Sequence, residues 1–157
     1  MIFVTIGVTE PFSRLIKKMD EIALEINEEV IIQRGDTEYV PENCESFQYC
    51  PEEEYQSYLQ EADLVVSHAG TGTVLNCAAN NTKIVLVPRR SKFGEHKTDH
   101  QVAEARTWNN KLEIPIVEDV DELESVIHQL ENIPTPSRED SGGLTEALHT
   151  EIQKRIN

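Results

Sequence analysis

The sequence predicts an α/β fold, with a doubly wound, mostly parallel, Rossmann-like sheet and a helix at the C-terminal end of the chain. Two observations support this prediction. Short apolar runs rich in β-branched residues alternate with segments of helical periodicity along most of the chain. These apolar runs lack the period-2 alternation of a half-exposed strand, as expected when helices cover both faces of a sheet.

The first half of the chain begins with MIFVTIG, a buried strand that ends in glycine. The next segment, from Ser13 to Ile26, carries apolar residues at helical spacing and starts just after Pro11. A helix from Pro51 to Glu61 has an acidic first turn, which suits the helix dipole. The expected strands of this half are residues 1–7, 30–35, 46–50 and 62–68.

The second half continues the alternation. Helices are expected over Thr71–Ala79, Asp99–Asn109 and Val120–Glu131, the last with four aliphatic residues on one face. The runs KIVLVP (83–88) and LEIPIVE (112–118) are expected to be strands, which gives a sheet of about six. Residues 134–143 are rich in proline, serine and glycine and indicate a linker. Leucine and isoleucine then recur at every fourth position, so residues 144–157 are expected to form an amphipathic helix.

Composition limits the possible functions. The 157 residues suffice for one domain with a substantial core. The net charge of −15 excludes a general nucleic-acid binder or a polybasic membrane clamp. The chain starts without a basic segment or a cleavage site, and no run approaches the length of a membrane span, so a cytoplasmic protein is expected.

A glycine-rich turn, SHAGTGT, joins the strand at 62–68 to the helix at 71–79. In a parallel sheet, ligands bind outside the carboxyl ends of the strands, where this turn lies. Gly70 and Gly72 let the backbone approach a ligand, and the unpaired N–H groups of the helix N-terminus attract a phosphate. Thr71 and Thr73 can add hydroxyl donors. The alternative is that the glycines serve the turn geometry only.

The loop RRSKFGEHK, residues 89–97, concentrates four of the chain's 14 Lys and Arg residues. It is followed by Asp99, His100 and Gln101, and it lies where a second ligand-facing loop is expected. The loop is either an anion site or a solvated surface segment. Two ligand chemistries fit the polar residues of this stretch. His96 and His100 could share a metal with Asp99, Glu95 or His68, although nearby cations oppose it; otherwise carboxylate, imidazole and amide groups could bind a sugar nucleotide.

The motifs TIGVTEPFSRLI, VIIQRG, ADLVVSHAGTGTVLN, KIVLVPR and GEHKTDHQ resemble, in this order, the C-terminal donor domain of glycosyltransferase family 28. The resemblance covers roughly residues 1–130. It is strongest to the small catalytic subunits of bipartite UDP-sugar transferases, which include the eukaryotic subunit acting on dolichol-linked sugars and bacterial capsule and exopolysaccharide subunits. The resemblance implies one half of a GT-B fold and an inverting, metal-independent enzyme. Residues 1–133 would then be the UDP-sugar-binding domain.

The resemblance also implies roles for individual residues. The glycine turn would hold the diphosphate, and the Asp99–Gln101 motif would contact the donor sugar. The charges of Arg89 and Arg90, independently of the resemblance, suit neutralisation of the diphosphate. His68, Glu95 and His96 are the candidate catalytic residues, but the base that deprotonates the acceptor stays unassigned among His68, His96, Glu10 and a residue of another chain. The expected donor-binding residues are Gly7, Thr9, Ser67, Ala69, Gly70, Thr71, Gly72, Thr73, Asn76, Arg89, Arg90, Asp99, His100 and Gln101.

Two positions depart from the family pattern. The first loop, GVTEPF, is one residue shorter than the GTHEQPF of related chains. The family pattern therefore does not establish Val8 and Thr9 as ligand contacts. In many relatives, a glutamate at the position of Asn76 accepts a hydrogen bond from a ribose hydroxyl. Asn76 lacks the negative charge of that acceptor. Donor affinity or nucleotide preference can therefore differ.

A complete GT-B enzyme needs two Rossmann-like domains, and this chain supplies one. The resemblance implies that a membrane-anchored subunit binds the lipid-linked acceptor and recruits this chain to the cytoplasmic face of the membrane. No cofactor and no metal are expected, because the UDP-sugar is a substrate. Two other functions remain open: a non-catalytic sugar-nucleotide-binding or regulatory subunit, and a metal-dependent hydrolase using His96 and His100.

Overall fold

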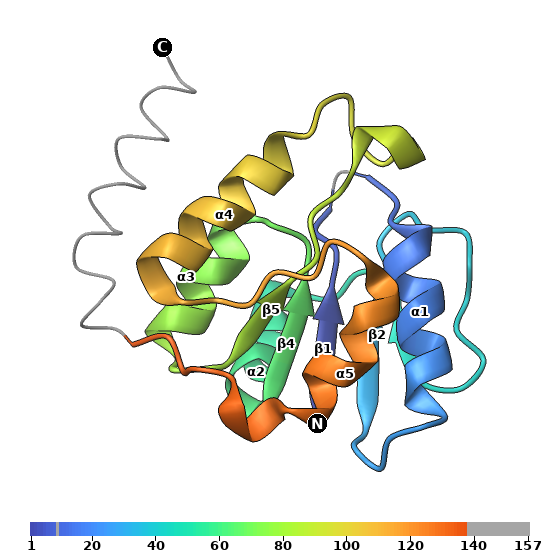
Figure 1. The fold of residues 1–157 in the computed structure, drawn as a ribbon. Helices are drawn as coiled ribbons and strands as arrows, with labels where there is room; N and C mark the ends of the chain where they lie inside the picture. Colours follow the sequence, from blue (N-terminus) through green and yellow to red (C-terminus); the bar gives the residue numbers. More distant parts are fainter. Residues whose placement is uncertain (9, 138–157) are drawn as a thin grey trace.

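A computed structural model describes residues 1–8 and 10–137 of the chain. The centre of the fold is a five-stranded sheet in which every pairing is parallel, with the strand order β3-β2-β1-β4-β5 (Figure 1). The strands are β1 (Ile2–Thr5), β2 (Val30–Gln33), β3 (Glu45–Phe47), β4 (Leu64–Ser67) and β5 (Ile84–Leu86). The predicted doubly wound Rossmann-like sheet is thus confirmed.

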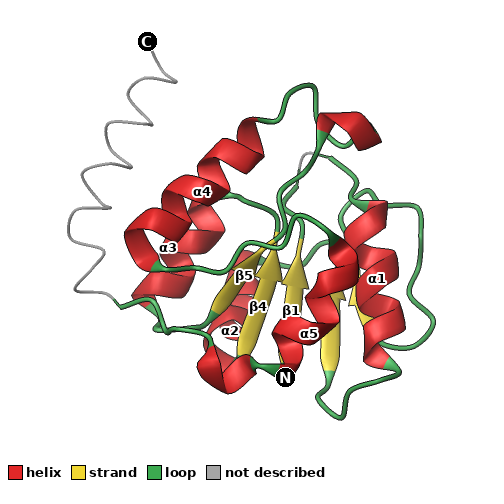
Figure 2. Cartoon of the chain, viewed as in Figure 1, coloured by secondary structure: helices red, strands yellow, loops and turns green. Residues whose placement is uncertain are grey.

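Helices cover both faces of the sheet (Figure 2). Helices α1 (Ser13–Ala23) and α5 (Leu123–His128) pack on one face. Helices α2 (Glu52–Glu61), α3 (Thr71–Ala79) and α4 (His100–Leu112) contribute to the core on the other. Within the described residues, no helix is long and apolar enough to cross a membrane.

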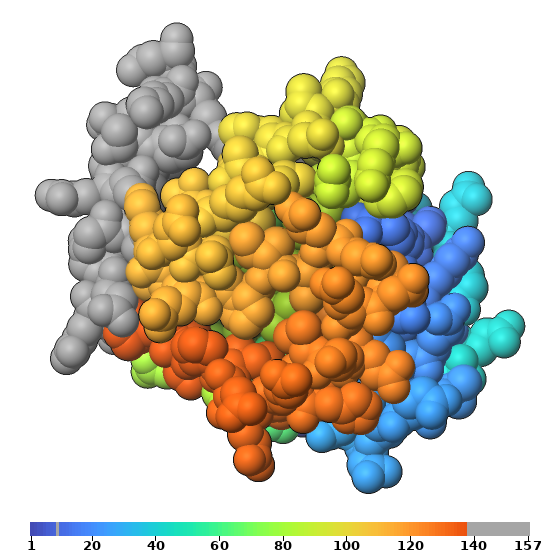
Figure 3. Space-filling view, viewed as in Figure 1, coloured from blue at the N-terminus to red at the C-terminus, as the bar shows by residue number. Residues whose placement is uncertain are grey.

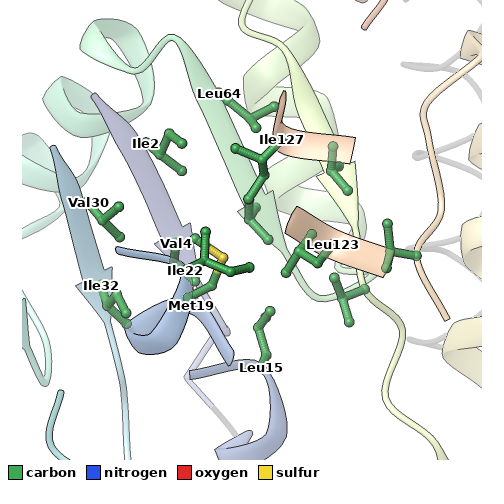
Figure 4. Packing of buried hydrophobic residues seen from close by; sticks show 14 of the residues in the cluster. Ile2, Val4, Leu15, Met19, Ile22, Val30, Ile32, Leu64, Leu123 and Ile127 are labelled. Carbon is green, nitrogen blue, oxygen red and sulfur yellow. The ribbon is translucent and has the colours of Figure 1, made fainter. Parts of the chain in front are cut away.

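Successive residues of each central strand enter opposite cores. In β1, Ile2 and Val4 join the cluster under α1 and α5, whereas Phe3 between them joins the cluster under α2, α3 and α4. Figure 4 shows the first cluster, in which Leu15 and Met19 of α1 and Leu123 of α5 approach the strands. Burial on both faces explains why the apolar runs show no alternation in the sequence.

The predicted sixth strand, residues 112–118, is wrong. Helix α4 continues through Leu112 and ends with Glu113 in the left-handed conformation, φ 57°. Only Ile116 then forms an isolated parallel bridge, with Leu86 at the edge of the sheet. Pro115 has no N–H to donate to a ladder and restricts the residue before it, so the pairing does not extend.

Several predicted boundaries shift. The helix expected over 13–26 ends at Ala23, and the helix expected over 120–131 divides into α5 flanked by 3₁₀ turns at Val120–Glu122 and Leu130–Asn132. Helix α3 has its predicted bounds. The expected terminal helix at 144–157, most of the expected linker and Thr9 lie outside the described residues.

Candidate functional site

The strand order places three candidate ligand-binding loops side by side: the β1–α1 loop, the β4–α3 glycine turn and the β5–α4 basic loop. Strands β1, β4 and β5 are consecutive neighbours, and they are parallel, so the loops after them emerge at one edge of the sheet. The chain winds from β1 to one side and from β4 to the other. The order therefore reverses between β1 and β4, which is where open α/β sheets bind ligands.

His68, directly after β4, lies at this reversal between two glycines. A Cβ atom built on Gly70 would lie only 2.3 Å from the His68 Nε2 atom, and one built on Gly7 would lie 2.9 Å from its Cε1 atom. Gly7 also has a φ of +77°, which disfavours side chains. These two glycines therefore make room for the imidazole ring, a reason that the sequence motif did not reveal.

The His68 imidazole is neutral at physiological pH. Burial lowers its pKa to about 3, and the nearby positive charge of Arg89 acts in the same direction, while a hydrogen bond with the Thr5 backbone acts against both. The Ser67 Oγ atom lies 3.3 Å from the His68 Nδ1 atom. A side chain with so low a pKa is a weak proton acceptor.

A cavity of about 280 Å³ opens between the β1–α1 loop, the β3–α2 loop and the start of α3. Four of the predicted donor-binding residues line it, and these are Gly7, Gly72, Thr73 and Asn76. Val8 also lines the cavity and is 71% exposed. It belongs to the shortened loop, whose ligand contacts the family pattern does not establish. The structure thus brings the first loop and the glycine turn to one concave surface.

The N-terminus of α3 faces this cavity without a capping side chain. Its N-cap residue is Gly70, no side chain caps the end, and the first turn holds no acidic residue. Gly72, in that turn, is exposed, and a Cβ atom added to it would meet no atom within 4 Å. Unpaired N–H groups and the positive end of the helix dipole make this open surface suitable for an anion.

A chain of polar side chains forms the floor of the cavity. The Tyr55 hydroxyl lies 3.2 Å from the Thr73 Oγ1 atom and 3.5 Å from the Thr5 Oγ1 atom. Thr5 donates to the Gln33 Oε1 atom at 2.8 Å, and the Gln33 amide donates to the carbonyls of Gly7 and Gln48. The network ties α3, α2, β1 and β2 together, and it fixes the Gly7 turn.

Sequence reasoning missed the residues that line the cavity from β2 and from the β3–α2 region. Besides Gln33, these are Tyr49, Cys50, Glu52 and Tyr55. One signal was present: VIIQ ends a fully buried apolar strand in an amide, and a buried amide requires partners. The others come from a loop and a helix whose composition resembles any exposed segment.

Arg89 points into the protein. It is only 1% exposed, and its Nη2 atom donates to the carbonyl oxygens of Ile6 at 2.8 Å and Glu10 at 2.7 Å. The guanidinium lies 4.9 Å from the centroid of the Phe12 ring. Burial lowers its pKa, although the charges of Glu10 and Glu95 oppose this. The observed contacts hold the β1–α1 loop, and contact with a diphosphate stays a prediction.

Glu95 and Arg90 of the β5–α4 loop have partners within the loop or in α1. Arg14 binds Glu95 through two hydrogen bonds of 2.9 Å, and the Arg90 N–H donates to the same carboxylate. This pairing joins the start of α1 to the loop, and in Figure 3 the yellow-green residues of the loop lie against the blue N-terminal region. The side chain of Glu95 is 8% exposed.

The Asp99–Gln101 motif also makes internal contacts. Asp99 accepts from the Ser91 N–H at 2.9 Å and the Ser91 hydroxyl at 3.0 Å, and these hydrogen bonds lower its pKa. It lies 3.7 Å from the Arg90 Nε atom. Gln101 accepts from the Arg89 N–H at 3.0 Å and is buried. These residues shape the loop, and their contact with a donor sugar stays a prediction.

The two histidines considered as metal ligands have separate partners. The His96 Nδ1 atom accepts from the Thr98 N–H, and the His100 Nε2 atom lies 3.0 Å from the Glu104 carboxylate. No group of three His, Cys, Asp or Glu residues in the described part of the chain is arranged to hold a metal ion. Of the other predicted contacts, Ser67 and Ala69 are buried, and Thr71 is half-buried in the first turn of α3.

The parallel sheet and the ligand-binding edge define a Rossmann-like α/β domain. The chain belongs to the glycosyltransferase family 28 C-terminal domain family, whose model matches residues 1–150. It is 27% identical over 128 residues to the UDP-N-acetylglucosamine transferase subunit ALG13 of Candida albicans. That match covers 77% of this chain and 42% of the relative, so the chain spans less than half of the relative's length.

Solved structures share the fold. The solution structure of ALG13 superposes with a TM-score of 0.63 at 19% identity, covering 94% of this chain and 93% of that one. MurG of Acinetobacter baumannii gives a TM-score of 0.58 at 19% identity, with 83% of this chain matching 41% of MurG. A glycosyltransferase of kitacinnamycin gives 0.62 at 17% identity, with 90% of this chain matching 38% of that enzyme. The resemblance predicted from the motifs is confirmed at the level of family and fold.

Proposed function

We propose that this chain is the catalytic, donor-binding subunit of a two-component inverting glycosyltransferase. It takes a sugar from a UDP-sugar, with UDP-N-acetylglucosamine or a similar donor, and moves it to a lipid-linked saccharide. The observation that carries the proposal is the uncapped N-terminus of α3 at the edge of a cavity, with open space over Gly72. A glycine inside a helix costs about 0.5–1 kcal/mol relative to alanine. No internal contact requires that cost here, whereas a closely approaching diphosphate does.

The two glycines of the turn have different roles. Gly70 accommodates His68, and Gly72 leaves the first turn of α3 open. The diphosphate accepts hydrogen bonds from the N–H groups of that turn, and the helix dipole stabilises the charge that develops on the departing UDP. The cavity between Gly72 and the β3–α2 loop takes the nucleoside, and Asn76 supplies an amide toward the ribose. The chemistry requires no metal to neutralise the leaving group.

A partner supplies the acceptor half of the enzyme. The chain corresponds to 38–42% of the length of several matched proteins, among them MurG. A membrane-anchored subunit that binds the lipid-linked acceptor would complete the cleft and hold this chain at the cytoplasmic face of the membrane. The relative from Candida albicans is itself named as a subunit, which supports this arrangement.

Calorimetric titration of the chain with UDP, without added metal, tests the proposal. We expect saturable binding that Gly72→Ala weakens and Gly72→Val abolishes, because the added carbons occupy the space over the turn. Both variants should fold, since a Cβ at this position meets no neighbour. Gln60→Val, at an exposed position of α2, is the matched control and should bind UDP like the wild type. Unchanged binding by Gly72→Val would refute the proposed diphosphate position.

A further inference from the structure

A second cavity, of about 230 Å³, lies on the other side of the β1–α1 loop. The loop lines the first cavity with Gly7 and Val8, and it lines the second with Glu10 and Pro11. Gly7 and Glu10 are three positions apart in the chain, so their Cα atoms lie within about 11 Å. The opposite wall of the second cavity is formed by Gly94, Glu95, His96 and Lys97. The two cavities therefore flank one loop at the ligand-binding edge.

Glu10 has a carboxylate oxygen without a partner. Its Oε2 atom is buried and accepts no hydrogen bond within the described residues. Its backbone is held by Arg89, which donates to the Glu10 carbonyl at 2.7 Å, and the same guanidinium attracts the carboxylate. A buried carboxylate oxygen left without a donor is costly, and such an atom is suited to a hydroxyl that arrives with a ligand.

The other candidate bases of this chain are less available. Glu95 lines the same cavity, but both of its oxygens bind Arg14. His68 has a pKa of about 3 and lies outside this cavity. His96 lines the cavity, but its Nδ1 atom accepts from the Thr98 N–H. Glu10 thus combines a free acceptor atom with a fixed backbone and a place in the cavity.

We propose that Glu10 is the general base that deprotonates the acceptor hydroxyl, an inference that rests on the proposed function. The acceptor oxygen forms a bond to the anomeric carbon of the donor sugar as its proton passes to the Glu10 carboxylate. The bond between the anomeric carbon and the β-phosphate oxygen breaks, and its electron pair leaves with UDP. The second cavity then holds the acceptor sugar, and the first holds the nucleotide.

The test replaces the chain with variants in the organism that carries it, so that the natural partner and acceptor are present. Isolated membranes with the bound chain receive radiolabelled UDP-N-acetylglucosamine, and label in the lipid extract is measured. We expect Glu10→Gln to reduce the transfer rate by about 100-fold or more, in the range of general base catalysis. The UDP dissociation constant of the purified variant should stay within threefold of the wild-type value. Glu25→Gln, at an exposed glutamate, should change neither quantity.

A chemical rescue separates catalysis from folding. Glu10→Ala leaves a space for a small carboxylate, so added formate should restore part of its transfer rate and should not affect wild type. Transfer by Glu10→Gln within threefold of wild type would overturn the proposal, as would a rate loss matched by weaker UDP binding. A loss in His96→Gln with none in Glu10→Gln would assign the base to His96 instead. If wild type neither binds UDP nor transfers label, the proposed function itself fails.

Discussion

The β4–α3 turn and the β5–α4 loop both suggest anion binding, but they are built in opposite ways. The turn carries no charged residue, and its helix N-terminus is uncapped and open. The loop is rich in cations, yet Arg89 binds backbone carbonyls and Arg90 lies beside Asp99. A cluster of cations in the sequence therefore does not by itself identify a ligand site. The structure shows that Arg89 and Arg90 contact groups of the protein itself. We assign the diphosphate to the uncharged turn.

The comparison is tested most strongly by removing the guanidinium of Arg89. We expect Arg89→Met to lower the free energy of unfolding by about 3 kcal/mol, because two inward carbonyl groups lose their donor. Urea denaturation measures this change. The matched control, Lys92→Met, alters an exposed cation of the same loop and should change stability by less than about 0.5 kcal/mol. Equal stability of Arg89→Met and wild type would mean that Arg89 is not a structural cation.

The two glycines of the turn should respond differently to the same substitution. Gly70→Ala places a methyl group 2.3 Å from the His68 ring and should destabilise the fold by about 2 kcal/mol, as overpacking does. Gly72→Ala adds the methyl group in open space within a helix and should raise stability by about 0.5–1 kcal/mol. Thermal and urea unfolding of the pair measures both signs. Identical effects would show that His68 does not occupy the space between Gly7 and Gly70.

His68 should make stability depend on pH. Its folded pKa of about 3 lies below the ordinary value of 6.5, so below pH 6.5 the unfolded chain binds a proton that the native ring does not. The native state therefore loses stability as the pH falls from 6.5 toward 3, by about 2 kcal/mol at pH 5. His68→Asn should remove this dependence. Urea titrations of both proteins between pH 5 and 8 measure the difference, and parallel curves would contradict the lowered pKa of His68.

The sequence predicted the parts of the fold that depend on local patterns. Helix α3 has its predicted bounds because the glycine turn marks its start. The strands that are buried on both faces were recognisable in the sequence as apolar runs. The prediction of a sixth strand was wrong because it relied on the apolar residues of this segment. It did not consider that Pro115 limits strand pairing or that α4 extends to Leu112. Periodicity could not show the internal pairing of Glu95 with Arg14, since these residues are 81 positions apart. The lining residues Tyr49, Cys50, Glu52 and Tyr55 were missed for the same reason, because only the fold brings them close to α3.

The position of the diphosphate is tested most directly by amide NMR during a titration with UDP. With ¹⁵N-labelled chain and no metal, we expect the largest shift changes at the backbone N–H groups of Gly72 and Thr73. The N–H groups of Ser91 and Lys92 in the basic loop should change little. Large changes in the basic loop, with the first turn of α3 unaffected, would contradict the assignment of the diphosphate to the glycine turn.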